Sequence, residues 1–303
     1  MIGYFSRQAL HARNGNPGQA TTLFLVVAST LMAMVFVSIA LHNICVDRVA
    51  CANAVDAIAL NAASWEARCL NMIAALNDGV AQCLRVIRWT CVVWAALAVA
   101  AAFGVGLPAF LEYTKYARKL ISGYWKTANQ LVEWSEKIRK AAPYLVLGET
   151  VALAKKRDVI GVLFPAIPGG PHDGRNTLEL HLEPGPPVTL MDAIAPITSA
   201  LKRIKKVRIL KGAARKVASF LEEALGAILG GGKGSLRMLV PEPDFPRRQF
   251  VRFAGSRTVP RLPIPLLGQK GNGRVFADAQ AEPYGGDSAK MTWKSRLTGW
   301  RDK

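Results

Sequence analysis

The sequence holds few side chains that could catalyse a reaction or bind a metal. All five cysteines lie in the first 91 residues, and no two of them form a Cys-x-x-Cys pair. The histidines are scattered at His11, His42, His172 and His181. A structural zinc site needs four ligands of these types at close spacing. We therefore expect no metal site, and we expect the cysteines to pack as small apolar residues.

A glycine-rich segment from Gly230 to Ser235 invites comparison with a phosphate-binding loop. Such a loop needs Lys followed directly by Ser or Thr, between a strand and a helix. Here Gly234 separates Lys233 from Ser235, and the preceding residues favour a helix. We interpret the segment as a flexible helix stop. No nucleophile–base pair, close carboxylate dyad or cofactor fingerprint occurs elsewhere, so we expect neither catalysis nor a cofactor.

A cluster of basic residues without any acidic neighbour is the strongest charge signal. The whole chain has a formal net charge of +18, from 39 Lys and Arg against 21 Asp and Glu. The cluster is an exposed helix face, a contact for anionic lipid, or a contact for nucleic acid. Nucleic acid is the least expected partner, because no aromatic-rich binding motif accompanies the cations. The cluster consists of Lys202, Arg203, Lys205, Lys206, Arg208, Lys211, Arg215 and Lys216.

The N-terminal third is strongly apolar, and between Asn14 and Val46 it contains no Lys, Arg, Asp or Glu. Its densest part, residues 20–45, is long enough to cross a hydrocarbon core of about 30 Å as a helix. A cleaved signal peptide is the alternative, but its apolar region is only about 7–15 residues long. The residues from Leu41 to Cys45 also make a poor cleavage site. We therefore expect a retained transmembrane helix over residues 20–45.

A second uncharged run extends from Trp89 to Leu111. It is also long enough to span a membrane, although Gly104, Gly106 and Pro108 weaken its last turns. The alternative is a buried helix in a helical bundle. We favour insertion, which makes residues 89–111 a second transmembrane helix.

The charges around the two runs bear on orientation. Arg7 and Arg13 precede the first run without any acidic residue, which favours a cytoplasmic N-terminus. Basic residues follow the second run, so the positive-inside rule gives a hairpin with both ends in the cytoplasm. Without insertion of the second run, everything after Val46 lies on the other side.

Long helices are expected because no proline occurs between Pro17 and Pro108. Residues 46–88 form an alanine-rich helical arm that packs on a second copy, on another membrane protein or on the second helix. A corner is expected at Asn77-Asp78-Gly79. The next helix, within residues 112–164, is expected to end before Pro143.

The remaining residues, 165–303, are basic and rich in glycine and proline. Alternating patterns predict strands at 178–182, 247–253 and 274–284, and residues 191–229 look helical. Residues 1–19 form a basic N-terminal segment. The predicted fold is therefore a mainly α membrane protein with one or two N-terminal transmembrane helices and an alanine-rich arm. A small, loosely built α+β module follows.

Two short elements flank the first apolar run. Gly18-Gln19-Ala20 precedes it, and the stretch NAVDAIALNA, from Asn53 to Ala62, follows it. This arrangement over residues 15–64 resembles Tad/Flp pilus-assembly proteins of the TadE/TadG-like type. Those proteins read Gly-Gln-Ala before the membrane helix and Asn-Ala-Ala-Asp-Ala-Ala-Ala-Leu-x-Ala after it. The positions that match this pattern include Gly18, Gln19, Asn53, Asp56 and Ala59.

The end of the chain adds a weaker resemblance to the tails of some large members. It comprises the residues from Ala277 to Tyr284 and from Trp293 to Leu297. Alanines at alternate positions suit a strand that packs closely on one face. In contrast, Leu23 stands where processed pseudopilins carry an acidic residue, so the resemblance does not imply cleavage by a prepilin peptidase.

The resemblance implies a non-enzymatic, pseudopilin-like protein of the bacterial inner membrane. It would assist assembly or anchoring of a Tad/Flp-type pilus or secretion apparatus, with lipid and other assembly proteins as partners. It also implies a C-terminal region outside the cytoplasm, whereas the charges above favour a hairpin. The alternative function is a membrane-anchored adaptor whose basic C-terminal region binds anionic lipid or nucleic acid.

Overall fold

The computed structural model describes residues 17–102, 105–165, 178–192, 194–195, 199, 234–243, 245, 249–260 and 272–298. Two helices dominate it: α2 (Pro17–Ala102) and α3 (Leu107–Lys156). The 86 residues of α2 form one unbroken rod, about 130 Å long at the rise of an α-helix. Before α3, Gly106 adopts a left-handed conformation with φ 77° that glycine reaches without strain. Pro108 follows in the first turn of α3, where a missing N–H costs nothing.

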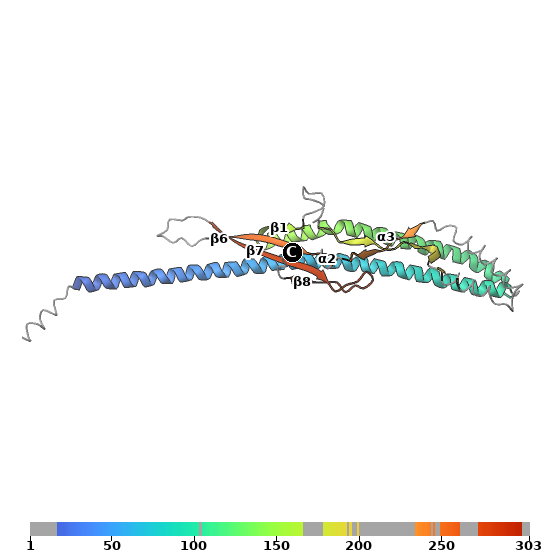
Figure 1. The fold of residues 1–303 in the computed structure, drawn as a ribbon, viewed down its shortest axis with the longest axis horizontal. Helices are drawn as coiled ribbons and strands as arrows, with labels where there is room; N and C mark the ends of the chain where they lie inside the picture. Colours follow the sequence, from blue (N-terminus) through green and yellow to red (C-terminus); the bar gives the residue numbers. More distant parts are fainter. Residues whose placement is uncertain are drawn as a thin grey trace, which may run out of the picture.

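The helix α3 folds back along α2 and covers only part of it (Figure 1). Near its C-terminal end, Ala154 belongs to the same buried cluster as Cys51 of α2. Near its N-terminal end, Phe110 packs on Trp94, with ring centroids 5.7 Å apart. The two helices therefore form a hairpin over the C-terminal part of α2, and the N-terminal part of α2 projects beyond it.

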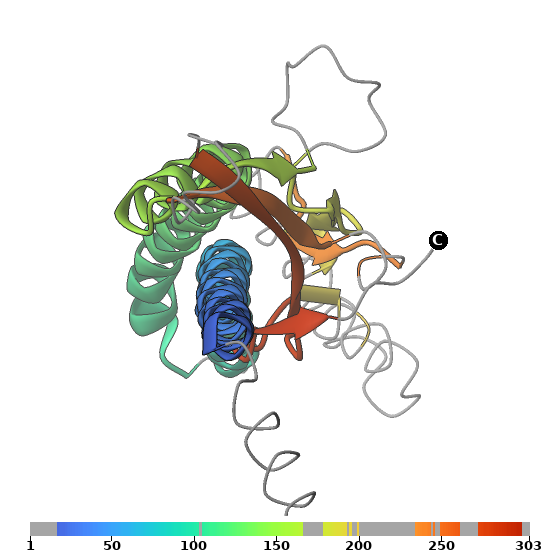
Figure 2. The same ribbon diagram turned by 90° about the vertical axis from the view of Figure 1, so that its left-hand side faces the viewer.

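A four-stranded antiparallel sheet lies on the middle of α2. Its order is β1-β6-β7-β8, with β1 at Ile160–Phe164, β6 at Val251–Pro260, β7 at Asn272–Tyr284 and β8 at Lys294–Thr298. Figure 2, viewed nearly along α2, shows the sheet curving around that helix on the side that α3 leaves open. Inward-facing Val251, Phe253 and Ala281 alternate with outward-facing residues, as expected for a sheet with one buried face.

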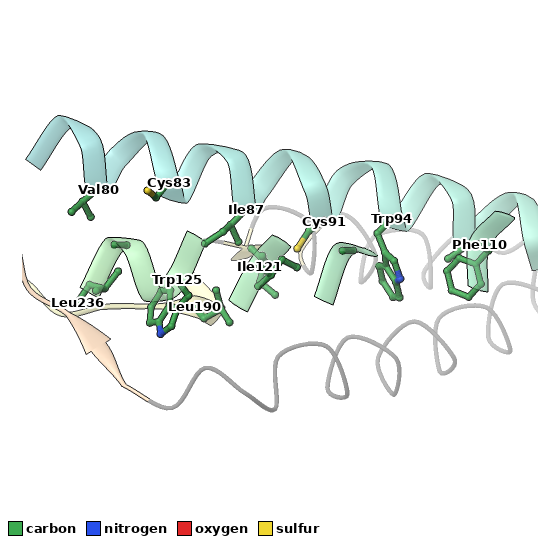
Figure 3. Close-up of a cluster of buried hydrophobic side chains, with 14 residues drawn as sticks. Val80, Cys83, Ile87, Cys91, Trp94, Phe110, Ile121, Trp125, Leu190 and Leu236 are labelled. Carbon is green, nitrogen blue, oxygen red and sulfur yellow. The ribbon is translucent and has the colours of Figure 1, made fainter. Parts of the chain in front are cut away.

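Two short antiparallel ribbons complete the described elements. The strands β2 (Leu182–Pro184) and β5 (Leu239–Pro241) form one, and β3 (Val188–Thr189) and β4 (Ser235–Leu236) form the other. The second ribbon closes a cluster at the end of the hairpin, where Leu190 and Leu236 meet Trp125 of α3 and Ile87 of α2 (Figure 3). The described C-terminal strands confirm a small antiparallel-sheet region after the two helices, which is part of the α+β prediction. These ribbons pack on the same two helices as the sheet.

The prediction of a second transmembrane helix at 89–111 is wrong for the bilayer that would hold residues 20–45. Cys45 and Trp89 lie on one unbroken helix, about 66 Å apart along its axis. That distance is twice the thickness of a hydrocarbon core, so both segments cannot enter the same membrane. The positive-inside hairpin with both ends in the cytoplasm fails for the same reason. Instead, Cys91, Trp94 and Ala98 are buried against α3.

Two predicted interruptions are also wrong, because tertiary packing overrides the local signal. The helix α2 continues through Asn77-Asp78-Gly79. A side chain at Gly79 would place its Cβ 3.1 Å from Cδ1 of Leu131, so glycine permits close approach of α3 there. The helix α3 likewise continues through Pro143, whose side chain is buried beside Ala142. This packing offsets the roughly 3 kcal/mol that an internal proline costs.

The predictions for the C-terminal strands have mixed outcomes. The strand expected at 274–284 is confirmed as β7, and the one expected at 247–253 corresponds to the start of β6. Leu178, Leu180 and Leu182 are all buried and Glu179 is exposed, as the predicted alternation expects, but regular strand pairing begins only at Leu182. The basic cluster Lys202–Lys216, Gly230 to Lys233 and most of the helix predicted over 191–229 lie outside the described residues.

Candidate functional site

The N-terminal third of α2, residues Thr21–Val49, has apolar side chains exposed on every side; we call it the bare segment. Exposure reaches 71% for Phe24, 58% for Leu31 and 63% for Phe36. Within the described residues, α2 is the one helix long and apolar enough to cross a membrane, and none of its most apolar stretch is buried inside the protein. Monomeric soluble proteins rarely expose so large a continuous apolar surface.

Three hydroxyl side chains of the bare segment form hydrogen bonds with the backbone of the same helix. Ser29 Oγ and Thr30 Oγ1 donate to the carbonyl of Val26, at 2.9 and 2.7 Å. Ser38 Oγ donates to the carbonyl of Met34 at 2.9 Å. Each hydroxyl is thus paired within the helix, which is the arrangement that a hydrocarbon environment requires.

The bare segment gives way to a covered segment, Cys51–Ala98, within two helical turns. Cys45 is exposed, whereas Cys51 is fully buried and its thiol donates to the carbonyl of Val275 at 3.5 Å. Charged residues begin at Asp47 and Arg48, at the same boundary. The change of composition and the start of the protein cover therefore coincide.

The covered segment contacts the sheet through small residues on both sides. Ala54 and Ala59 of α2 lie in one buried cluster with Ala279 and Ala281 of β7. At Gly255 of β6, an added Cβ would come within 3.0 Å of the side chain of Val55 and 2.7 Å of that of Val159. Such small residues let the sheet backbone approach the helix closely.

This interface joins the two segments that carry the family resemblance. Ala59 is fully buried in it, Asp56 is half-buried beside it, and Asn53 is exposed. The alternate alanines of β7 face the helix, as the pattern predicted. Gly18 and Gln19 lie far away, in the first turn of α2.

A buried polar group lies farther along the covered segment. Glu66 is 2% exposed, and burial raises the pKa of its carboxyl group to about 8, although a hydrogen bond from Gln249 lowers it. Gln249 Oε1 in turn accepts from the backbone N–H of His181 at 3.0 Å. Among the described residues, Glu66 Oε2 has no hydrogen-bond partner. At neutral pH the carboxyl is therefore mainly protonated and uncharged.

Two asparagines of α2 hold the C-terminal strands in place. Asn71 donates through Nδ2 to the carbonyl of Trp293 at 3.1 Å and accepts from its N–H at 3.0 Å. Asn77 donates to the carbonyls of Leu239 and Ser288, at 2.8 and 2.9 Å. The asparagine that we expected at a corner is thus a buried contact to two distant segments.

Four of the five cysteines are buried and pack as small apolar residues, whereas Cys45 is exposed. Burial raises the pKa of Cys69 and of Cys91 to about 11, so neither thiol ionises readily. A raised pKa makes a cysteine a poor nucleophile and a poor metal ligand. In the described ranges, no group of three or more Cys, His, Asp or Glu is placed to hold a metal ion.

No protein-family model, curated protein or solved structure matches this chain. The site is therefore defined by its geometry. The bare segment of α2 is exposed, and the covered segment that continues it packs against the sheet. Sequence reasoning found the bare segment and the alanine-rich motif. It missed Glu66, Asn71 and Gln249, because a single polar residue on a helix carries no local sign of burial.

Proposed function

We propose that this protein is a membrane-anchored, non-enzymatic structural component of a bacterial pilus-assembly or secretion apparatus, similar to TadE/TadG-like proteins. The observation that carries the proposal is the bare segment, which continues without a break into a covered segment that begins with the family-like motif. The bare segment anchors the protein in the inner membrane. The hairpin and the sheet form a rigid stalk beyond the bilayer, which offers other assembly proteins a surface fixed at a set height.

The unbroken helix also supports one orientation. Because α2 enters the membrane once, the hairpin and the sheet lie on the side opposite to the N-terminus. Arg7 and Arg13 before the span favour a cytoplasmic N-terminus. The stalk then lies outside the cytoplasm, which agrees with what the family resemblance implies and does not suit binding to cytoplasmic nucleic acid.

Cysteine labelling tests the orientation. In a Cys45→Ser background, the remaining cysteines of α2 are buried, so Asn53→Cys provides one exposed thiol just beyond the span. We expect a membrane-impermeant maleimide to label it in cells with a permeabilised outer membrane. The matched Asn14→Cys variant should react only after the inner membrane is lysed. The reverse pattern would favour the cytoplasmic adaptor.

Two further experiments test the anchor and the role. The protein should stay in the membrane pellet after carbonate washing, and a monodisperse chain in plain buffer would contradict the anchor. Purification from mild detergent after crosslinking in cells should recover pilus-assembly or secretion proteins. Recovery of none of them, with the topology confirmed, would leave an anchored protein without the proposed role.

A further inference from the structure

The end of the α2–α3 hairpin has a surface that the proposed function does not use. From Trp89 to Leu111 the chain contains no charged residue. Trp94 packs on Phe110 (Figure 3). Its Nε1 donates to Thr114 Oγ1 at 3.0 Å, which aligns the two helices at this end. On the straight α2 the same level lies about 75 Å beyond Cys45, far from the first membrane.

Apolar side chains on the outer faces of both helices are exposed at this end. On α2, Val92 is 39% exposed and Val93 is 43% exposed. Leu107 is 52% exposed and Leu111 54% exposed on α3. The inner faces are meanwhile filled by the buried cluster around Trp94. The tip is thus a packed wedge with an apolar exterior on both of its helices.

A belt of aromatic and basic residues surrounds the base of this wedge. Trp89 and Tyr116 are 63% and 57% exposed, respectively. Among the residues that the structure describes, the exposed cations outnumber the one acidic residue at this level, Glu112. Exposed tryptophan and tyrosine next to cations are typical of residues at a membrane–water interface. The cations of the belt are Arg85, Arg88, Lys115, Arg118 and Lys119.

The dimensions of the wedge fit one lipid leaflet. From the level of Val92, where the exposed apolar residues of the tip begin, to the end of α2 at Ala102, the helix rises about 15 Å. One leaflet of the hydrocarbon core is about 15 Å thick, and interfacial helices enter it by about 5–10 Å. The wedge can therefore enter the near leaflet without crossing the bilayer, while the belt stays at the level of the headgroups.

We propose that the hairpin tip inserts into the near leaflet of a second, anionic membrane that faces the membrane holding the bare segment. The protein then tethers two bilayers across about 75 Å of its own helix. Charge complementarity favours lipid as the occupant, because the belt is basic and the wedge carries no charge. Apolar residues are exposed on both helices. Lipid can surround the tip and contact both of them, whereas a protein partner would bind one face. This inference does not depend on the pilus-assembly role.

A tethering experiment tests this with the full chain. The protein is reconstituted in nanodiscs through its bare segment and then mixed with vesicles of equal phosphatidylcholine and phosphatidylglycerol. We expect the nanodiscs to float with these vesicles, and far less with pure phosphatidylcholine. Replacing both Leu107 and Leu111 by serine should weaken binding roughly tenfold for each leucine removed from lipid. Leu145→Ser and Val151→Ser, at exposed sites elsewhere on α3, are the matched controls.

Two further variants distinguish a lipid contact at the tip from a protein contact. Lys115→Gln with Lys119→Gln should reduce the preference for phosphatidylglycerol roughly fivefold for each cation. Leu107→Cys in the Cys45→Ser background, labelled with a polarity-sensitive dye, should brighten on vesicle addition. Flotation that equals the wild type in the tip variant, or a dye that stays in water, would overturn the proposal. Binding of the tip to a purified protein without lipid would overturn it in favour of a protein partner.

Discussion

The bare and covered segments of α2 belong to one continuous helix, yet they follow different rules of composition. The bare segment carries large apolar residues such as Phe24 and Phe36 on all sides. The covered segment places small residues such as Ala54 and Ala59 on its buried face and charged residues elsewhere. Helix propensity does not explain the difference, because both segments are helical. The surroundings of each segment do.

Side-chain size along α2 therefore follows from what each segment packs against. Lipid tails adapt to any apolar shape, so large residues are tolerated around the whole circumference. A sheet is a rigid partner, and close packing against it requires small side chains at the contact. Polar residues follow the same logic. Hydroxyls of the bare segment pair within the helix, whereas Asn71 and Asn77 of the covered segment reach other parts of the chain.

The strongest predicted effect is a loss of stability around the covered segment as the pH rises. Burial raises the pKa of Glu66 to about 8 in the folded protein, above the usual value of about 4.3. As pH rises between these values, the unfolded chain releases the proton first, so the free energy of unfolding falls by about 1.4 kcal/mol per pH unit. The loss levels off above the folded pKa. Glu66→Gln should match the wild type near the lower pKa and exceed it by several kcal/mol in alkali.

Urea unfolding in mild detergent across this pH range measures the difference. Glu133→Gln is the control, because a hydrogen bond from Lys137, at 2.8 Å, lowers the pKa of that exposed carboxylate. That variant should not relieve the alkaline loss. Equal alkaline stability of wild type and Glu66→Gln would show that the carboxyl is hydrated in the folded protein.

The second prediction concerns the membrane insertion of the bare segment. An arginine at Val35, near the centre of the apolar run, should cost about 3 kcal/mol of membrane insertion. We expect part of the Val35→Arg protein to leave the membrane during carbonate extraction. Asn53→Arg, on an exposed position of the covered segment, should remain fully membrane-bound. If carbonate extracts both variants equally, the bare and covered segments lie in the same environment. That result would contradict a membrane location for the bare segment alone.

A smaller effect tests the role of side-chain size. Ala59 is fully buried against β7, so Ala59→Leu should overpack the interface and cost about 2 kcal/mol of unfolding free energy. Ala33→Leu introduces the same side chain at an exposed position of the bare segment. It should leave both stability and membrane retention unchanged. Thermal unfolding followed by circular dichroism distinguishes the two variants, and equal melting temperatures would contradict a tight helix–sheet contact.

Much of the framework was predictable, because uncharged apolar length and strand alternation are local properties. The long apolar helix and β7 are confirmed on those grounds. The continuation of α2 through Gly79 and of α3 through Pro143 was not predictable. Glycine and proline signal a break locally, and only the facing helix explains why none occurs. The second apolar run resembled a second span because composition alone does not show that Cys91, Trp94 and Ala98 pack against α3.

The candidate site was predictable only in its separate pieces. The resemblance identified residues 53–62 and 277–284, but nothing in either stretch shows that they contact each other. Their separation exceeds 200 residues, and pairing over such distances depends on the whole topology. Glu66 illustrates the same limit. An acidic residue in a helix is usually solvated, whereas this one is buried and accepts a hydrogen bond from the distant Gln249.

The weakest predicted effect concerns the hydrogen bonds between the covered segment and the residue just before β8. Asn71→Ala removes both hydrogen bonds to the backbone of Trp293. Because Asn71 is only half-buried, water can reach the freed groups, and the cost should be about 1 kcal/mol. Hydrogen exchange should show faster opening of β8 with little change in the α2–α3 hairpin. The exposed Asn53→Ala should change neither. An equal loss of hydrogen-exchange protection in the sheet and the hairpin would instead mean that they unfold as one unit. The sheet could then not separate from α2 while the hairpin stays folded.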